Sequence, residues 1–423
     1  MSSSLIIINI QQLVNVSEQS TLLKGAAMAE LPCIENAFLL IEEGIIVDYG
    51  AMYELEIKVP QLPKYIIDAR GQFVLPAWCD SHTHLVFAAS RETEFIDKIK
   101  GMSYAEIAAK GGGILNSAQK LNDATEDDLF IQAWQRLQQV SKLGTGAIEI
   151  KSGYGLTVAG ELKMLRVIKK LKEKSSLSIK STFLAAHAYP LQFKENHQGY
   201  IDSIINEMLP VIANEKLADY IDVFCETGFF SPQEMEIICK AGMRHGLKPK
   251  LHVNQLNSIG GIEMGLQLKA VSLDHLETLT DKEISLLGNQ NFSSDKDNET
   301  ICTLLPTAAF FLRMAFQPAR KLINAGCAIA LASDYNPGSS PSGNMNLVVA
   351  ISCIQMKMLP EEAINAATIN GAYAMELQNE VGSITIGKKA NFIFTKPIPS
   401  LAYLPYSFGT NLIDKVMING EFI

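Results

Sequence analysis

The chain has 423 residues, with 36 Lys and Arg against 45 Asp and Glu, and its formal net charge at pH 7 is −9. Hydrophobic residues make up 48% of the sequence and charged residues 19%, which is enough apolar material for a sizeable core and excludes a disordered chain. An acidic balance without a basic block is not typical of a nucleic-acid binder. No apolar run is long enough to span a membrane, so we expect neither nucleic acid nor membrane as a partner.

The cysteines and the first residues indicate the compartment. Seven cysteines are scattered along the chain without a Cys-x-x-Cys pair, which is typical of a reducing cytosol rather than of a disulfide framework. The first positive charge is Lys24, so the apolar start lacks the basic region of a secretory signal. We therefore expect a cytoplasmic protein.

Both ends of the chain carry short runs rich in β-branched residues. They lie at 4–10, 37–41 and 45–47 near the start, and at 383–386, 391–394 and 416–418 near the end. We interpret them as one composite β-sandwich-like domain built from 1–75 and 380–423. Two unrelated flanking segments are the alternative.

The middle of the chain alternates between apolar runs and amphipathic stretches. The runs are 73–75, 147–150, 181–186, 220–224, 249–253, 270–273, 301–305 and 328–332, and helical stretches include 127–142, 159–174 and 232–245. Eight strands alternating with helices predict an α/β fold with a (β/α)8 TIM-like barrel over 76–379. An open doubly wound sheet is the alternative, but no Gly-x-Gly-x-x-Gly follows the first strand.

Polar residues follow most of these apolar runs. In such a barrel the strand ends meet at one face, where active sites lie, so these residues are the functional candidates. Five of the seven histidines occupy such positions. In chain order the candidates are Asp80, His82 and His84, then Lys151 and Tyr154, His187, Glu226, His252 and Gln255, Asp274, His275 and Glu277, and Asp334.

The pair His82 and His84 is the first sign of a metal site. On an extended strand the side chains of His-x-His point to the same face. Adding His252 and Asp334 gives three imidazoles and one carboxylate, which leaves room for the water that a catalytic metal needs. We predict one divalent metal per chain on these four residues, and the ligand set accepts Zn2+ or iron (Fe2+/Fe3+).

The same residues carry a family resemblance. The stretch 75–84, His252, His275 and 332–334 resemble the amidohydrolase superfamily of metal-dependent hydrolases. Nearly the whole chain is similar to one member of it, through 151–156, 186–190, 222–226 and 334–341, with Arg91, Tyr104 and the glycines 111–113. For that member the resemblance implies hydrolysis of 4-imidazolone-5-propanoate to N-formimidoyl-L-glutamate in histidine degradation. A homodimer is the expected assembly.

The resemblance also implies roles for particular residues. Asp334 or His275 would handle the proton of the attacking water, and the two assignments remain open. Arg91 has a planar fork that suits the carboxylate of a small anionic substrate. The positions that the resemblance places against substrate are Arg91, Tyr104, Tyr154, His187, Gln255, Asn336, Gly338 and Ser339. By itself, 336–338 is also an ordinary turn signal.

Other chemistries compete with this interpretation. Two-metal superfamily members carry a carboxylated lysine after strand four, but here Cys225 and Glu226 follow that strand, and Lys151 follows strand two. A cyclic imidase would need that second metal, and Glu226 has no assigned role. A base deaminase would place Glu three residues after the strand-five histidine, where this chain has Gln255, which does not transfer protons that way. A non-catalytic binding module would usually have lost metal ligands.

Overall fold

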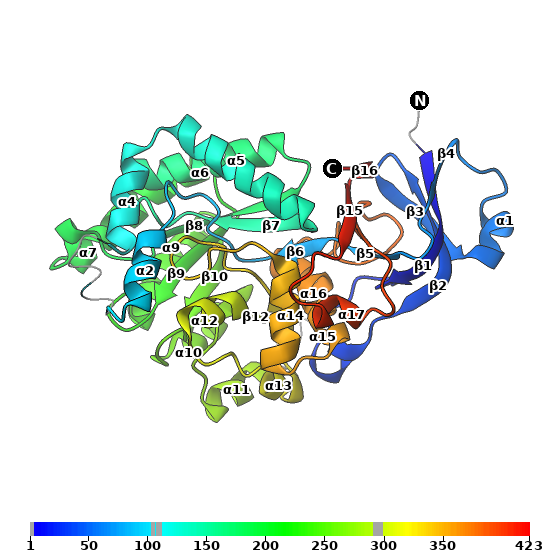
Figure 1. Cartoon of the computed structure of the whole chain (residues 1–423). Coiled ribbons are helices and arrows are strands. Elements are labelled where there is room, and N and C mark those ends of the chain that lie inside the picture. The colour runs from blue at the N-terminus through cyan, green and yellow to red at the C-terminus, as the bar shows by residue number, and fades with distance from the viewer. Residues whose placement is uncertain (1–3, 103–105, 107–111, 291–298) are drawn as a thin grey trace.

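The computed structural model describes residues 4–102, 106, 112–290 and 299–423. These residues form two eight-stranded sheets, one of them parallel and ringed by helices, the other built from both ends of the chain (Figure 1). The α/β fold with a TIM-like barrel is therefore confirmed. In the part of the chain just delimited, no helix is long and apolar enough to cross a membrane.

The terminal sheet joins strands from the two opposite ends of the sequence. Its strands follow the order β16-β15-β14-β5-β1-β2-β3, and β4 pairs with β1 in parallel. Their bounds are β1 Ser4–Val14, β2 Cys33–Glu42, β3 Ile45–Ala51, β4 Tyr65–Asp68, β5 Phe73–Pro76, β14 Phe392–Thr395, β15 Ile413–Ile418 and β16 Glu421–Phe422. Side chains of these strands, such as Leu39, Val74, Phe392 and Met417, pack into one buried cluster. Short helical turns flank the sheet at α1 Leu55–Lys58 and α17 Tyr403–Tyr406.

Two of the strand predictions are wrong. The run 73–75, predicted as the first barrel strand, lies in β5, which pairs with β14 and β1 in the terminal sheet. The first barrel strand is β6, Trp78–Asp80. The run 383–386 forms no strand, and only Ile384 makes a single bridge to Val16. Both runs are short, and only long-range pairing decides their place.

The barrel strands neighbour one another in chain order, from β6 to β13. After β6 they are β7 Thr145–Lys151, β8 Ser178–Ala186, β9 Tyr220–Cys225, β10 Lys248–Val253, β11 Ser272–His275, β12 Ile301–Leu304 and β13 Ile329–Leu331. The ring closes beyond the strand ends, where the Asp334 amide donates to the His82 carbonyl and the His84 amide to the Tyr335 carbonyl. The buried Asp80 carboxylate adds two hydrogen bonds from Ser333 to this closure.

Helices cover the outside of the barrel (Figure 1). Thr125 and Thr157 cap the N-termini of α5 and α6 by accepting a backbone N–H, which explains why both begin directly after a threonine. The helices are α2 Glu92–Ile99, α4 Ile114–Asp123, α5 Glu126–Lys142, α6 Val158–Lys174, α7 His197–Ser203, α8 Leu209–Glu215, α9 Pro232–Arg244, α10 Gly261–Gln267, α11 Asp281–Gly288, α12 Pro306–Leu312, α13 Ala319–Asn324, α14 Met345–Met356, α15 Pro360–Ala367 and α16 Ile369–Ala374. All seven cysteines are free thiols, as their spacing predicts.

Candidate active site

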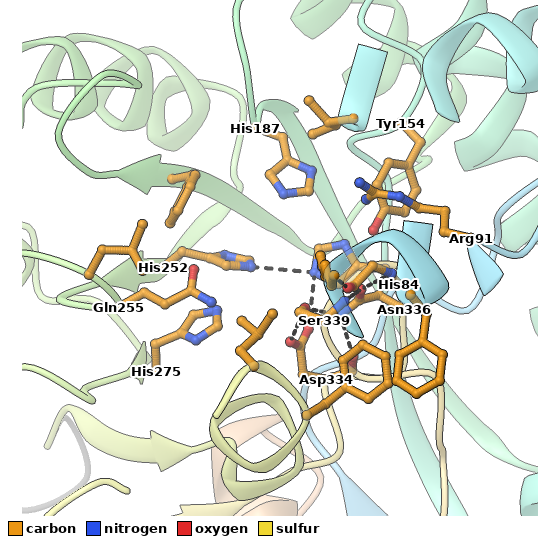
Figure 2. A pocket seen from close by; sticks show the side chains of 18 of the residues that line it. His84, Arg91, Tyr154, His187, His252, Gln255, His275, Asp334, Asn336 and Ser339 are labelled. Atoms are coloured by element: carbon orange, nitrogen blue, oxygen red, sulfur yellow. Dashed lines mark hydrogen bonds and ion pairs between the residues drawn. The ribbon is translucent and has the colours of Figure 1, made fainter. Parts of the chain in front are cut away.

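A cavity of 660 Å³ opens at the carboxyl ends of the barrel strands. Figure 2 shows side chains from several strand ends pointing into it. Of the predicted site residues, those that line it are His84, Arg91, Tyr154, His187, His252, Gln255, His275, Asp334, Asn336, Gly338 and Ser339. His82 lies directly beneath, fully buried, and completes the group of imidazoles. Tyr104 and Gly111 fall outside the described residues.

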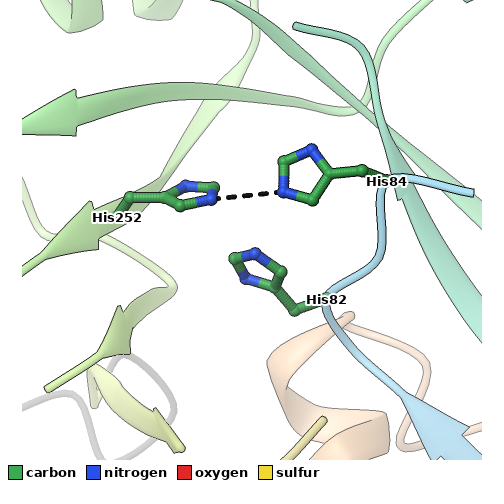
Figure 3. Close-up of side chains that lie close together, drawn as sticks. All are labelled: His82, His84 and His252. Atoms are coloured by element: carbon green, nitrogen blue, oxygen red, sulfur yellow. Dashed lines mark hydrogen bonds between the residues drawn. The ribbon is translucent and has the colours of Figure 1, made fainter. Parts of the chain in front are cut away.

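Three imidazoles converge at the floor of this cavity (Figure 3). One ligating nitrogen from each of His82, His84 and His252 lies within 4.8 Å of the other two. The Nε2 atoms of His84 and His252 are 3.4 Å apart. Burial holds the pKa of all three imidazoles well below the ordinary value, so they are neutral at pH 7, as metal ligation requires.

Asp334 closes the group from the segment after β13. Its Oδ1 lies 3.6 Å from the Nε2 atoms of both His82 and His84. Its Oδ2 accepts a hydrogen bond from Ser339 at 3.1 Å. Burial raises the pKa of this carboxyl to about 6, although His275 and the Ser339 bond oppose the rise. Asp334 has a φ of 51°, in the left-handed region that non-glycine residues rarely adopt, and such outliers often mark functional positions.

The geometry fits a tetrahedral metal ion. Two nitrogens bound to one zinc at about 2.0–2.1 Å lie about 3.3–3.4 Å apart, close to the observed 3.4 Å between His84 and His252. The buried Nε2 of His82 has no hydrogen-bond partner, which is costly unless an acceptor of its lone pair is present. These four side chains could therefore hold a metal.

Two buried aspartates orient the imidazoles, and the sequence analysis missed their part in the site. The Nδ1 of His82 lies 2.6 Å from Asp274, and the Nδ1 of His252 lies 2.7 Å from Asp222. A carboxylate that accepts Nδ1–H fixes the tautomer in which Nε2 carries the free lone pair. The sequence indicates Asp274 only as a polar residue after strand six, and Asp222 only within a stretch that carries the family resemblance. A charged residue inside an apolar strand is the one signal that pointed to them.

Lys151 lies at the centre of the charges beneath this site. Its fully buried ammonium is 2.6 Å from Glu149, 2.9 Å from Asp222 and 3.7 Å from Asp274. Burial alone would lower the pKa of Lys151, but the three carboxylates outweigh it and raise that pKa, so the side chain stays charged. Lys151 therefore joins the two aspartates that hold His82 and His252, and does not itself face the cavity.

We expect Lys151→Met to destabilise the metal-free protein by about 3–5 kcal/mol, because it removes the ammonium that pairs with the buried Asp222 carboxylate. Urea unfolding followed by circular dichroism measures this free energy. Lys282→Met is the matched control, since its pair with Glu263 is largely exposed, and we expect a change within about 0.5 kcal/mol. Equal stability of the two variants would refute the role assigned to Lys151.

His275 approaches the site from the end of β11. Its Nδ1 lies 3.3 Å from the Glu277 carboxylate, which in turn accepts a hydrogen bond from Gln317. Burial by itself lowers the pKa of His275, but the carboxylates of Glu277, Asp334 and Asp274 outweigh this effect, and the pKa is raised overall. The backbone is strained here as well, with a φ of 89°. The ring of His275 lines the cavity, and it is able to hold a proton there.

Gln255 stands on the loop after β10, and Glu226 shapes that loop. The Glu226 carboxylate accepts backbone hydrogen bonds from Thr227, Leu256 and Asn257, and a further one from the Asn257 side chain. Glu226, which had no role in the sequence analysis, thus holds in place the loop that carries Gln255. Its hydrogen bonds also leave it poorly suited to bind a second metal.

Tyr154 and His187 form the wall beside His84. The His187 ring stacks on the His84 ring with centroids 5.3 Å apart, and its Nδ1 is 3.0 Å from the Gly153 carbonyl. Burial lowers the pKa of His187 to about 4, so this imidazole is neutral. The loop that carries Tyr154 is fixed by a fully buried carboxylate, since Glu161 accepts three backbone N–H groups from residues 153, 155 and 156.

Arg91 lies at the other side of the cavity, paired with Glu94. Its Nε donates to Glu94 at 2.9 Å, while the second oxygen of Glu94 accepts the Gly113 amide at 3.0 Å. A Cβ on Gly338 would come within 2.4 Å of the Arg91 Nη1, so only glycine permits this approach. The Asn336 side chain accepts hydrogen bonds from the backbone amides of Gly338 and Ser339. The turn that the sequence indicates at 336–338 is therefore present.

Comparisons with known proteins agree with this arrangement. Residues 73–423 match the model of the amidohydrolase family. An imidazolonepropionase from Flavobacterium johnsoniae is 58% identical over 417 residues, which is 98% of each chain. An imidazolonepropionase from Christiangramia forsetii is 54% identical over 422 residues, which is 99% of this chain and 100% of that one.

Solved structures support the fold alone, because their sequences are distant. A guanine deaminase from E. coli has a TM-score of 0.73 at 13% identity and covers 100% of this chain and 99% of its own. A guanine deaminase from C. acetobutylicum has a TM-score of 0.69 at 17% identity, with 100% of both chains covered. Full-length identities of 58% and 54% separate the close relatives from these deaminases, and the chain therefore belongs to the amidohydrolase family and, within it, to the imidazolonepropionases.

Proposed function

We propose that this chain hydrolyses the cyclic amide C–N bond of 4-imidazolone-5-propanoate to give N-formimidoyl-L-glutamate, a step of histidine degradation. The observation that carries the proposal is the convergence of three imidazoles and Asp334 in a cavity that also presents Arg91. The names of the two bacterial relatives, which match nearly the full length of this chain, support the same substrate.

His82, His84, His252 and Asp334 would hold one metal ion, with zinc or iron as the candidates. When bound, the metal would supply a water acidic enough to lose a proton near neutral pH. In the described part of the chain, these histidines form the single group of three or more close His, Cys, Asp or Glu side chains suited to a metal. We propose one metal per chain, and elemental analysis of the purified protein tests that number.

Asp334 and His275 would move the protons of the reaction. Asp334, lying beside the water that the metal would hold, could accept the proton of that water through a carboxylate oxygen. His275, held through Nδ1 by Glu277, would present its other ring nitrogen to the cavity and pass a proton to the ring nitrogen that leaves. Gln255 would orient the ring without exchanging a proton.

Arg91, Tyr154, His187, Asn336, Gly338 and Ser339 would position the substrate, and Tyr104 is proposed to join them. The guanidinium of Arg91 is planar and can bind a carboxylate through two N–H groups. Its Nε and Nη2 donate to Glu94, which leaves the Nη1 edge beside Gly338 for the substrate. The propionate of the substrate would meet that edge.

The deciding experiment follows the ultraviolet absorbance of freshly prepared imidazolone propionate with holoenzyme, chelated enzyme and no enzyme. Loss of the substrate absorbance with formation of formimidoylglutamate, but without ammonia, supports the proposal. Release of ammonia with the ring intact would instead identify a base deaminase, the nearest rival. We further propose a cytoplasmic homodimer that binds no nucleic acid, which sedimentation velocity and filter binding can test.

We expect Arg91→Met to raise the Michaelis constant by one to three powers of ten, since a charge-assisted hydrogen bond is worth roughly 1.5–3 kcal/mol. Arg91→Lys should recover part of this loss, because a lysine keeps the charge but not the fork. Steady-state kinetics on the metal-loaded variants measures both. An unchanged Michaelis constant in Arg91→Met would mean that other residues of the cavity bind the substrate carboxylate.

A further inference from the structure

A second cation faces the cavity beside Arg91, and the sequence analysis did not single it out. Lys98 lies on α2 four residues after Glu94 and seven after Arg91, a spacing that places all three on one face of the helix. Lys98 lines the same cavity as Arg91, Asn336 and Gly338. It is half-buried, so its ammonium has lost part of its water shell.

The two cations converge on one residue of the turn after β13. The Nζ of Lys98 donates to the Gly338 carbonyl at 3.3 Å, and the Arg91 Nη1 occupies the space where a Gly338 side chain would be. A hydrogen bond of 3.3 Å from an ammonium to a neutral carbonyl is long. A carboxylate placed here would accept shorter, charge-assisted bonds from both cations.

The charges that line this end of the cavity do not balance. Among the described residues that line the cavity, Arg91, Lys98 and Arg313 are cations, and the adjoining Glu94 supplies one negative charge that is shared between Arg91 and the Gly113 amide. Burial and the neighbouring Arg91 lower the pKa of Lys98, and Glu94 offsets only part of that. The side of the cavity next to α2 therefore carries more positive than negative charge, which suits a ligand that bears a carboxylate.

We propose that Lys98 binds the side-chain carboxylate of the substrate together with Arg91 and so sets the preference for carboxylate-bearing substrates. This inference rests on the proposed function, and names a residue of its binding site. It assigns Lys98 to substrate affinity and not to the chemical step, because Arg91, at the start of the same helix, lies across the cavity from His275 (Figure 2).

The test compares Lys98→Met and Lys98→Arg with the parent holoenzyme. Lys100→Met is the matched control, since Lys100 ends the same helix but is exposed and does not line the cavity. We expect Lys98→Met to raise the Michaelis constant about 10-fold with turnover unchanged, which is the loss of one partly exposed charge-assisted bond. Lys98→Arg should restore most of the affinity, and Lys100→Met should match the parent.

A second arm uses calorimetry with 3-(imidazol-4-yl)propanoate and its neutral amide as probes. The parent should prefer the carboxylate, and Lys98→Met should lose about 10-fold of that preference. Equal weakening of both probes, a change confined to turnover, or an unchanged Michaelis constant would each overturn the proposal. If the parent does not hydrolyse imidazolone propionate, the proposed function fails, while the probe arm still decides whether Lys98 binds a carboxylate.

Discussion

We expect His252→Ala to lose both the bound metal and all measurable hydrolysis while keeping the fold. The Nε2 of His252 lies 3.4 Å from that of His84, so the substitution removes one of the four proposed metal ligands. The barrel should survive, because Asp222 keeps its ion pair with Lys151 and its hydrogen bond from the residue 252 amide. Elemental analysis, circular dichroism and the ultraviolet assay measure the three outcomes.

The control for this variant is His197→Ala. His197 has a side chain that is 47% exposed and stacks on Tyr189, and it does not line the cavity. We expect parent metal content and parent rate. If His252→Ala retained a full equivalent of metal, the ligand group proposed here would be wrong, whatever its activity.

We expect His275→Asn to lower turnover by about 10²–10⁴, the usual effect of removing a proton-transfer group, while metal content stays at the parent value. Asparagine keeps a polar side chain that can hydrogen-bond Glu277, but it cannot take up and release a proton near neutral pH. The Michaelis constant should change little, because in the proposed function Arg91 would hold the substrate from the other side of the cavity.

Metal analysis and single-turnover kinetics separate the two possible roles of His275. A slow chemical step with full metal assigns proton transfer to His275. Turnover at the parent rate would leave the proton to Asp334 alone and make His275 a structural residue. Loss of metal in the variant would show instead that His275 supports the metal-binding residues. This outcome is worth testing because the rings of His275 and His252 have centroids 5.2 Å apart.

The sequence predicted the barrel and the position of its site for a local reason. Buried parallel strands appear as continuous apolar runs, and β7, β8, β9 and β10 contain the runs predicted for them. Since the carboxyl ends of such strands meet at one face, polar residues after the runs had to lie together. The histidines and Asp334 could therefore be predicted as site residues without knowing which strands are neighbours.

The placement of short segments required the tertiary structure. Residues 73–75 and 78–80 are close neighbours in the sequence, yet the first run lies in the terminal sheet and the second in the barrel. A short apolar run is compatible with either place, and pairing with β14, near the other end of the chain, decides the first case. The sequence predicted 73–75 as the first barrel strand, whereas in the structure 78–80 has that place.

The chain by itself determined the residue types that a metal and a carboxylate require, together with the strand ends that present them. Only the tertiary structure decided which buried charged side chains hold those residues in place. Asp222, Asp274 and Lys151 lie on three different strands, and Lys98 lies on a helix whose facing turn comes 240 residues later. A buried charge is stable only beside its partners, and those partners are brought together by the closure of the barrel, which no local pattern in the sequence specifies.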